Sequence, residues 1–198
     1  GIAVHHYKDA VIFEREEVLT ASGTPFSVFT PYKNAWLKTL TPFYLRVYPV
    51  DACAGRLAAQ STAVPSLQEM GFAPARLAVL ELPAGMAGGA RLFDEFLQRI
   101  DRYQETRDFP AVKGVSYLSA HLRFGTVSVR QLAAAAWQKG GPGAQTWLSE
   151  LIWRDFYHQI LWHRPDVASG HSFRRQYDAL PWPNPPGHFA AWCDARTG

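Results

Sequence analysis

At positions 147–157 the chain reads Trp-Leu-Ser-Glu-Leu-Ile-Trp-Arg-Asp-Phe-Tyr, and this pattern predicts a helix with two different faces. At about 100° per residue, one face collects aromatic and charged side chains: Trp147, Glu150, Arg154 and Tyr157. Trp153 and Leu151 fall at its two margins. The opposite face is apolar: Leu148, Ile152 and Phe156. A solvated face seldom gathers large aromatic rings, and a core face seldom carries unpaired charges.

Two interpretations of the mixed face remain open. Glu150 and Arg154 are spaced to form an ion pair within the helix, which would contribute only a few tenths of a kcal/mol, about 0.2–0.5. Alternatively, the indoles, the phenol and the two charges form a wall that stacks against and hydrogen-bonds a flat polar ligand. Periodicity alone does not separate these two interpretations.

The apolar spacing outside this segment predicts a chain that is largely helical after Gly89. Helices are expected at 90–108, 119–124, 128–138, 145–163 and 187–194, with Ser128 as an N-cap and Pro165 ending the long helix. The range 166–186 is expected to be rich in loops. The first fifth of the chain is α/β-like, with strands expected at 2–7, 10–13 and 26–29, and a short helix at 34–40. The Pro- and Gly-rich range between them predicts a linker.

Two shorter motifs suit anionic ligands. Ser116 and Ser119 precede a predicted helix, where backbone N–H groups and hydroxyls can bind a phosphate, or where the serines simply cap the helix. Tyr103 and Arg107 lie one turn apart, so both can reach phosphate groups, or both can lie on a solvated face.

Composition narrows the classes of protein. The 198 residues are 47% hydrophobic and 19% charged, as expected for a globular protein with a core. The net charge of +3 is weak evidence for a nucleic-acid partner. Cys53 and Cys193 have no metal-ligand spacing and are expected to be reduced thiols. From these reduced thiols we expect a cytoplasmic protein. The absence of an apolar run of about 18 residues argues against a membrane span, and we expect a monomer.

The motifs together resemble the DNA photolyase/cryptochrome family. The resemblance rests on residues 23–36 (Gly-Thr-Pro-Phe-Ser-Val-Phe-Thr-Pro-Tyr-Lys-Asn-Ala-Trp), on the motifs between 107 and 125, on 147–157, and on Trp182, Trp192 and Thr197-Gly198. It implies a mainly α fold, the N-terminal part of a helical FAD-binding domain preceded by the C-terminal remnant of an α/β Rossmann-like antenna domain. The implied boundaries are 1–40 for the antenna remnant, 41–92 for an interdomain linker and 93–198 for the helical domain. The chain is therefore expected to be an incomplete piece.

The resemblance also implies an activity. Members of this type are lyases that repair cyclobutane pyrimidine dimers in DNA by light-driven electron transfer from reduced FAD, with the damaged dinucleotide flipped into the pocket. The string Glu-Leu-Ile-Trp-Arg at 150–154 favours the class I cyclobutane-dimer type. A second, antenna chromophore of the folate or deazaflavin type is not assignable. By itself the piece is expected to bind FAD poorly or not at all.

Individual roles follow from the same resemblance. The residues implied to contact FAD are Tyr103, Val115, Ser116, Tyr117, Leu118, Ser119 and Trp147. The residues implied to contact DNA are Arg107, Glu150, Leu151, Ile152, Trp153, Arg154, Asp155, Phe156 and Tyr157. Among these, Glu150 would hydrogen-bond a base of the dimer and Trp153 would stack on it. Trp182 would be the solvent-side end of an electron-transfer chain. A cryptochrome-type blue-light signalling protein, or a structural module without a cofactor, are the competing hypotheses.

Overall fold

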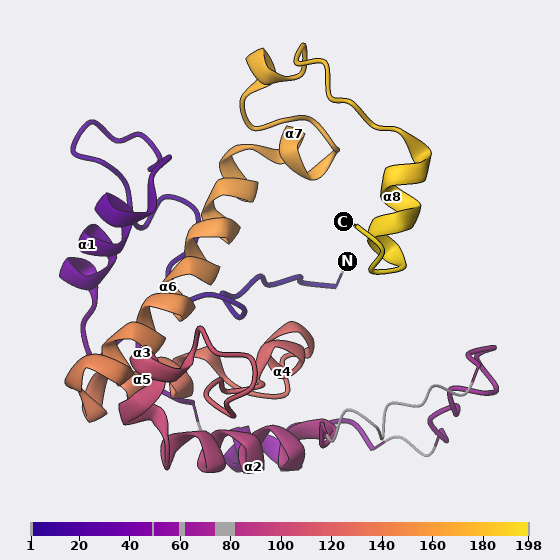
Figure 1. The fold of residues 1–198 in the computed structure, drawn as a ribbon. Helices are drawn as coiled ribbons and strands as arrows, with labels where there is room; N and C mark the ends of the chain where they lie inside the picture. Colours follow the sequence, from indigo (N-terminus) through magenta and orange to yellow (C-terminus); the bar gives the residue numbers. More distant parts are fainter. Residues whose placement is uncertain (1, 49, 60–61, 74–81, 198) are drawn as a thin grey trace. The chain divides into compact units, whose positions relative to one another are not determined.

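The computed structural model describes residues 2–48, 50–59, 62–73 and 82–197, and in these ranges the regular structure is helical, with no strand (Figure 1). The predicted helical character is confirmed. The elements are α1 (Phe29–Thr39), η1 (Val50–Arg56), α2 (Gly85–Leu97), η3 (Ile100–Arg102), α3 (Tyr103–Thr106), α4 (Ser119–Phe124), α5 (Val129–Lys139), α6 (Gly141–His163), α7 (Pro165–Ala168), η4 (Arg175–Tyr177) and α8 (Pro186–Cys193).

The chain forms two compact units, Gly1–Ile160 and Leu161–Gly198. Within the second unit the described residues are all exposed or half-buried. Its start is braced by a bidentate pair, in which the Nε and Nη2 of Arg164 each donate to Asp166 at 2.9 Å. The predicted domain boundaries at 40 and 92 stay predictions.

The hydrophobic core of the first unit joins α6 to α1, α2 and α5. Its best-buried side chains come from each of these helices: Trp36, Phe96, Leu132 and Ile152. Aromatic contacts connect the helices, since Tyr32 on α1 lies 5.2 Å from Phe156 on α6 between ring centroids. The apolar face predicted for 147–157 is therefore the face that α6 buries.

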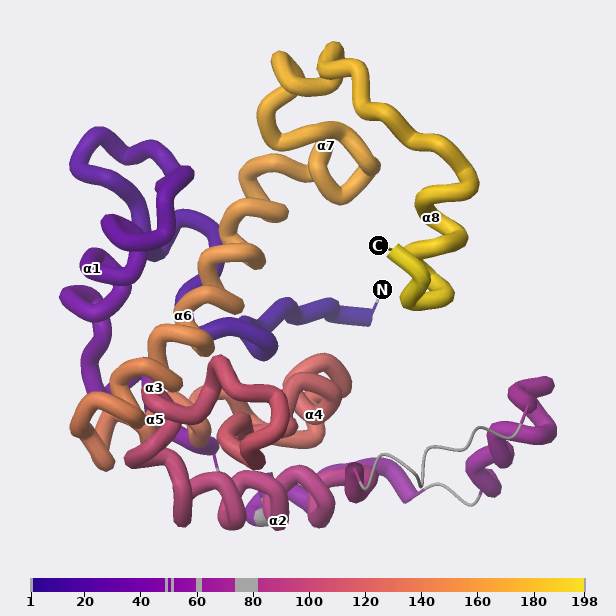
Figure 2. The backbone as a smooth tube through the Cα atoms, viewed as in Figure 1, coloured from indigo at the N-terminus to yellow at the C-terminus, as the bar shows by residue number. Residues whose placement is uncertain are grey.

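Asp155 fastens the N-terminal segment to α6. Its buried Oδ2 accepts hydrogen bonds from the backbone N–H of Ile12 at 3.1 Å, the N–H of Phe13 at 3.2 Å and the indole N–H of Trp36 at 3.0 Å. Its neighbour Arg154 donates to the carbonyl of Ala10. Figure 2 shows the N-terminal tube running alongside α6. Burial raises the pKa of Asp155 to about 6, although the three N–H donors favour its charged form.

The strands predicted at 2–7, 10–13 and 26–29 are wrong. A strand needs a ladder partner for its backbone, and the N–H groups of Ile12 and Phe13 donate to a carboxylate instead. Phe29 already belongs to α1, which begins five residues before the predicted helix at 34. Pro31 was interpreted as the end of a strand, but proline is also tolerated in the first turn of a helix.

The helix predicted at 90–108 begins earlier and is interrupted. α2 runs from Gly85 to Leu97, so it begins within the range 41–92 that was predicted as linker, and η3 and α3 follow. The break lies at Arg99, whose backbone N–H donates to Phe96 O at 2.9 Å instead of to Glu95. The Glu95 carbonyl accepts from the Arg99 guanidinium at 2.8 Å, so the side chain replaces the missing backbone donor.

The long helix α6 begins four residues before its predicted start. Gly140 and Gly141 both have positive φ, 64° and 79°, which allows a tight connection from α5. Pro142 then fits the first turn. Position 143 requires glycine, because a Cβ there would lie 2.2 Å from the Ile100 carbonyl oxygen. The predicted N-cap of α5 is confirmed, because Ser128 Oγ accepts from Gln131 N.

We predict that Asp155 makes stability depend on pH. Its folded pKa of about 6 lies above the ordinary value of 3.8, so its contribution to the unfolding free energy is fully present below pH 3.8 and is lost as pH rises through 6. The difference in unfolding free energy between wild type and Asp155→Asn should therefore fall by about 2–3 kcal/mol between pH 4 and 7. Urea denaturation at a series of pH values measures it.

Asp178→Asn is the matched control, because Asp178 is an exposed carboxylate in the second unit. Its difference from wild type should stay flat over the same pH range. A flat difference for Asp155→Asn as well would mean that the N–H donors fully offset the effect of burial on the pKa of Asp155.

Candidate functional site

A broad cavity of about 2160 Å³ lies in the first unit. Its walls come from the N-terminal segment, from α2, from the loop before α4, from α5 and from α6. The lining residues of greatest chemical interest are Lys8, Arg46, Tyr103, Ser116, Tyr117, Ser119, Arg123, Arg130, Trp147, Glu150, Arg154 and His158. Residues predicted as site residues in three separate parts of the sequence therefore line the same cavity.

The loop 115–119 forms one wall of this cavity. Val115, Ser116, Tyr117 and Ser119 line it, whereas Leu118 is buried in the core. Simple capping by Ser119 is not observed, because the N-cap of α4 is Leu118 and has no side-chain hydrogen bond. Ser116 Oγ accepts from Leu118 N at 3.4 Å. Tyr117 has φ of 57°, a left-handed conformation that is strained for a side chain of this size.

Tyr103 and Trp147 are mostly buried and still reach the cavity. Trp147 packs against the rings of Phe93 and Phe96 on α2, with centroid distances of 6.1 and 4.8 Å. Tyr103 packs edge-on to Phe96. Burial raises the pKa of Tyr103, and the carboxylate of Glu150 adds to this effect. The phenol is therefore neutral near pH 7 and can donate a hydrogen bond.

Glu150 pairs with Arg107, not with Arg154. The Glu150 Oε1 to Arg107 Nη1 distance is 2.5 Å, and the pair joins α6 to the end of α3. The ion pair that was considered within the helix is therefore absent from the side-chain contacts described, since Arg154 turns to Ala10 O instead. Arg107 also lies over the ring of Tyr103, at 5.6 Å from its centroid. The two charges predicted for DNA contact therefore neutralise each other at the cavity margin.

Trp153 and Tyr157 belong to a separate aromatic surface. Trp153 stacks on Phe29 of α1 with ring centroids 3.6 Å apart and an interplanar angle of 7°. Tyr157, 56% exposed, stacks against Trp153 at 5.5 Å. Phe29 was missed as a partner of this surface because its segment was interpreted as a strand. The stack lies on the exposed side of the α1–α6 contact, away from the cavity lining.

Several residues predicted to contact DNA lie in the core. Ile152, Asp155 and Phe156 are almost fully buried, and Leu151 is buried with part of its surface at the cavity. Helical spacing placed Ile152 and Phe156 on the apolar face, so their burial agrees with the pattern. Nothing in the local pattern indicated that Asp155 accepts hydrogen bonds from residues more than one hundred positions away. These side chains have a packing role, and we restrict the proposal below to residues that are half-buried or exposed.

Trp182 belongs to the second unit and is 77% exposed. Trp182 is not among the residues that line the cavity of the first unit. Neither a cluster of metal-ligating side chains nor a helix long and apolar enough for a membrane span occurs in the described parts of the chain.

The lining fits a large ligand that carries both flat rings and anionic phosphate groups, as FAD does. Hydroxyl groups line one wall, from Tyr103, Ser116, Tyr117 and Ser119. Basic side chains also belong to the lining: Lys8, which pairs with Glu17 at 2.5 Å, and Arg46, Arg123, Arg130 and Arg154. Sequence analysis did not predict this set of basic residues, because its members are scattered from position 8 to 154. Hydroxyls and cations suit phosphate oxygens, and the indole of Trp147 provides an apolar surface.

Comparisons with known proteins agree with this fit. Residues 147–198 match the family described as the FAD binding domain of DNA photolyase. The whole chain is 33% identical to a deoxyribodipyrimidine photo-lyase of Halobacterium salinarum and 31% identical to that of Escherichia coli, and it covers 43% of each relative.

The fold has a counterpart among solved structures. A bacterial class III photolyase from Agrobacterium tumefaciens superimposes with a TM-score of 0.77 at 24% identity, over 93% of this chain and 39% of that one. The chain thus spans less than half the length of the proteins that it matches. Motif, lining and fold thus agree in a similarity to DNA photolyases that extends over the whole chain.

Proposed function

We propose that the protein in which this chain occurs repairs cyclobutane pyrimidine dimers in DNA by light-driven electron transfer from reduced FAD. One observation carries the proposal: Tyr103, the loop 115–119 and Trp147 line a single cavity although they are distant in sequence. Relatives named deoxyribodipyrimidine photo-lyase support the choice of reaction.

In this proposal the cavity holds FAD, which when bound and reduced supplies the electron on excitation by light. The hydroxyls of Ser116 and Ser119 and the phenol of Tyr103 donate to the phosphate and ribityl oxygens. Val115 and Leu118 act through their backbone, because their side chains are apolar. The basic side chains of the lining balance the phosphate charge, and their charge-assisted hydrogen bonds favour an anionic ligand.

The apolar wall keeps water from the reacting groups. Trp147 stacks on Phe93, and Leu151 closes the same side of the cavity. Excluding water lowers the local dielectric and limits proton leakage during a charge transfer. Trp147 is held on one side by the core, so its ring has a fixed position when a ligand enters.

Two groups of side chains are proposed to contact DNA. Arg107 fixes Oε1 of Glu150, which leaves the carboxylate oriented at the cavity margin to accept from a base. Trp153 and Tyr157 provide rings for stacking, a contact that contributes about 1–3 kcal/mol per base. The electron-transfer role of Trp182 rests on the resemblance alone.

We predict light-dependent repair. The protein, loaded with FAD and reduced, should restore thymine pairs in an oligonucleotide that carries one cyclobutane dimer, under blue light but not in the dark. Chromatography of the oligonucleotide measures the product, with an undamaged oligonucleotide as the control. Bound flavin without repair would contradict the proposal and favour the signalling alternative, and absence of bound flavin would contradict the assignment of the cavity.

We predict that Trp153→Ala weakens binding of dimer-containing DNA by about tenfold or more, since one stacking platform is lost. FAD binding should be unchanged, because Trp153 lies outside the cavity lining. Fluorescence anisotropy and flavin absorbance measure the two affinities.

Trp137→Ala is the matched control, since Trp137 is a half-exposed tryptophan on α5, 49% exposed, without an assigned contact to DNA. It should bind dimer DNA as the wild type does. Equal loss of flavin and DNA binding in Trp153→Ala would identify Trp153 as a core residue.

A further inference from the structure

The loop 115–119 has a conformation that needs support from outside. Tyr117 has φ of 57°, and a residue other than glycine held in the left-handed region costs on the order of 1 kcal/mol or more. The loop has little internal bonding, since the described hydrogen bond within it is the long one from Leu118 N to Ser116 Oγ at 3.4 Å. Besides the buried side chain of Leu118, a group at the start of the loop is therefore needed to hold Ser116 and Ser119 at the cavity.

Arg99 is placed to supply this support. Its Nη2 donates to the carbonyl oxygen of Val115 at 2.8 Å, and its Nη1 donates to the carbonyl oxygen of Glu95 at 2.8 Å. The guanidinium therefore bridges the last turn of α2 and the first residue of the loop. A planar fork can reach two carbonyl groups at once, which a lysine ammonium does less rigidly.

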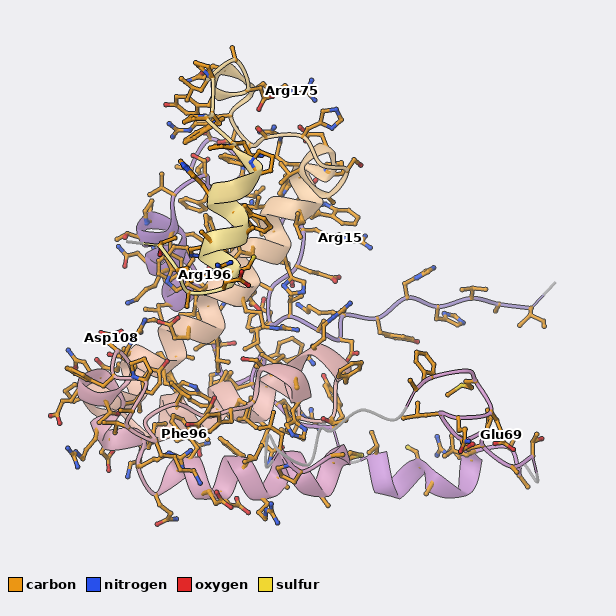
Figure 3. The ribbon with its side chains drawn as sticks, turned by 45° about the vertical axis from the view of Figure 1, so that its right-hand side comes forward. Arg15, Glu69, Phe96, Asp108, Arg175 and Arg196 are labelled. Atoms are coloured by element: carbon orange, nitrogen blue, oxygen red, sulfur yellow. The ribbon has the colours of Figure 1, made fainter. Side chains whose placement is uncertain are left out.

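The surroundings of Arg99 fix the direction of this fork. Its guanidinium lies 5.4 Å from the ring centroid of Phe96, which is fully buried and is labelled in Figure 3. The helix break at Arg99 releases the Glu95 carbonyl from its usual backbone donor, and the guanidinium takes that position. The Arg99 Nε is buried and has no partner among the described residues. Two backbone carbonyls and one ring thus define where the guanidinium lies.

The same end of the loop is also held by close packing. Gly114 lies so near Thr106 that an added Cβ would be 2.5 Å from Thr106 Oγ1 and 2.8 Å from the Thr106 carbonyl oxygen. The loop therefore approaches α3 closely just before the carbonyl that Arg99 binds. The conformation of 115–119 is therefore constrained by the contact at Gly114, by the hydrogen bond at Val115 and by the burial of Leu118.

We propose that Arg99 is the positioning residue of the phosphate-binding loop. Arg99 does not line the cavity, and it acts through the Val115 carbonyl to keep the Ser116 and Ser119 hydroxyls turned toward the phosphate groups of a dinucleotide cofactor. This inference rests on the proposed function for the identity of the ligand, but the contact between Arg99 and the loop is testable without a ligand.

Hydrogen exchange of the full chain, followed by mass spectrometry, tests the contact. Arg99→Met keeps the apolar stem and removes both donors, so exchange in the peptide covering 113–124 should become faster by about tenfold, as expected for loss of a charged hydrogen bond. Arg99→Lys keeps the charge and should give an intermediate rate. Arg102→Met is the matched control, because its exposed side chain contacts only Glu105 among the pairs described, at 3.6 Å.

Two results would overturn the inference: an unchanged rate in 113–124 for Arg99→Met, or an increase spread evenly over α2, α5 and α6. FAD titration, followed by flavin fluorescence, is the second arm. If wild type binds FAD, Arg99→Met should weaken binding by about tenfold and Arg99→Lys by less, and equal affinities would overturn the positioning role. If wild type binds no FAD, as expected for this chain by itself, the exchange rates alone decide the role of Arg99.

Discussion

The carboxylate of Asp155 is the contact on which the arrangement of the first unit depends. A buried carboxylate is costly unless donors surround it, and here the donors come from two segments far away in sequence, at Ile12–Phe13 and at Trp36. A chain without a strand in its described N-terminal residues thereby gains a fixed place beside α6. Removal of the carboxylate would leave those N–H groups without an acceptor, at about 1–3 kcal/mol for each.

One wall of the cavity depends on these hydrogen bonds of Asp155. Lys8, Asp9, Ala10 and Ile12 belong to its lining, and they are in place because Arg154 and Asp155 bind the backbone of the same segment. The opposite wall is built differently, from a loop that Arg99 and Gly114 constrain. Helix α6 connects the two walls, since it carries Trp147 and Glu150 into the cavity from its first half. The ligand site is therefore the product of long-range polar contacts added to a helical core.

Local patterns predicted much of the fold. Helical spacing identified α4 with its observed bounds, and it located α5, α8 and most of α6, because their apolar residues recur at helical intervals and their ends carry glycine, proline or serine. It failed where a tertiary contact determined the backbone. The N-terminal segment has an apolar run typical of a strand, yet its N–H groups bind Asp155. The helix expected at 90–108 breaks at Arg99, where the guanidinium binds the carbonyl that the break leaves without a backbone donor.

The residues that form the candidate site could be predicted from the sequence better than the contacts that these residues make. Tyr103, Ser116, Ser119, Trp147 and Glu150 were identified from motifs, and they do meet at one cavity. The partners depend on residues that only folding brings together, such as Arg107 for Glu150 and Phe29 for Trp153. Short-range spacing offered Arg154 as the partner of Glu150, and the structure instead turns Arg154 toward the N-terminal segment.

Native-state hydrogen exchange at the backbone amides of Ile12 and Phe13 tests the central role of Asp155 most directly. These amides lie outside any helix, so ordinary loop residues at such positions would exchange fast, through local opening. If the carboxylate fastens the segment, both amides should be as protected as those in the middle of α6 and should exchange only through global unfolding. Exchange at the rate of exposed loop amides would contradict the account, because the N-terminal wall of the cavity would then have no fixed position.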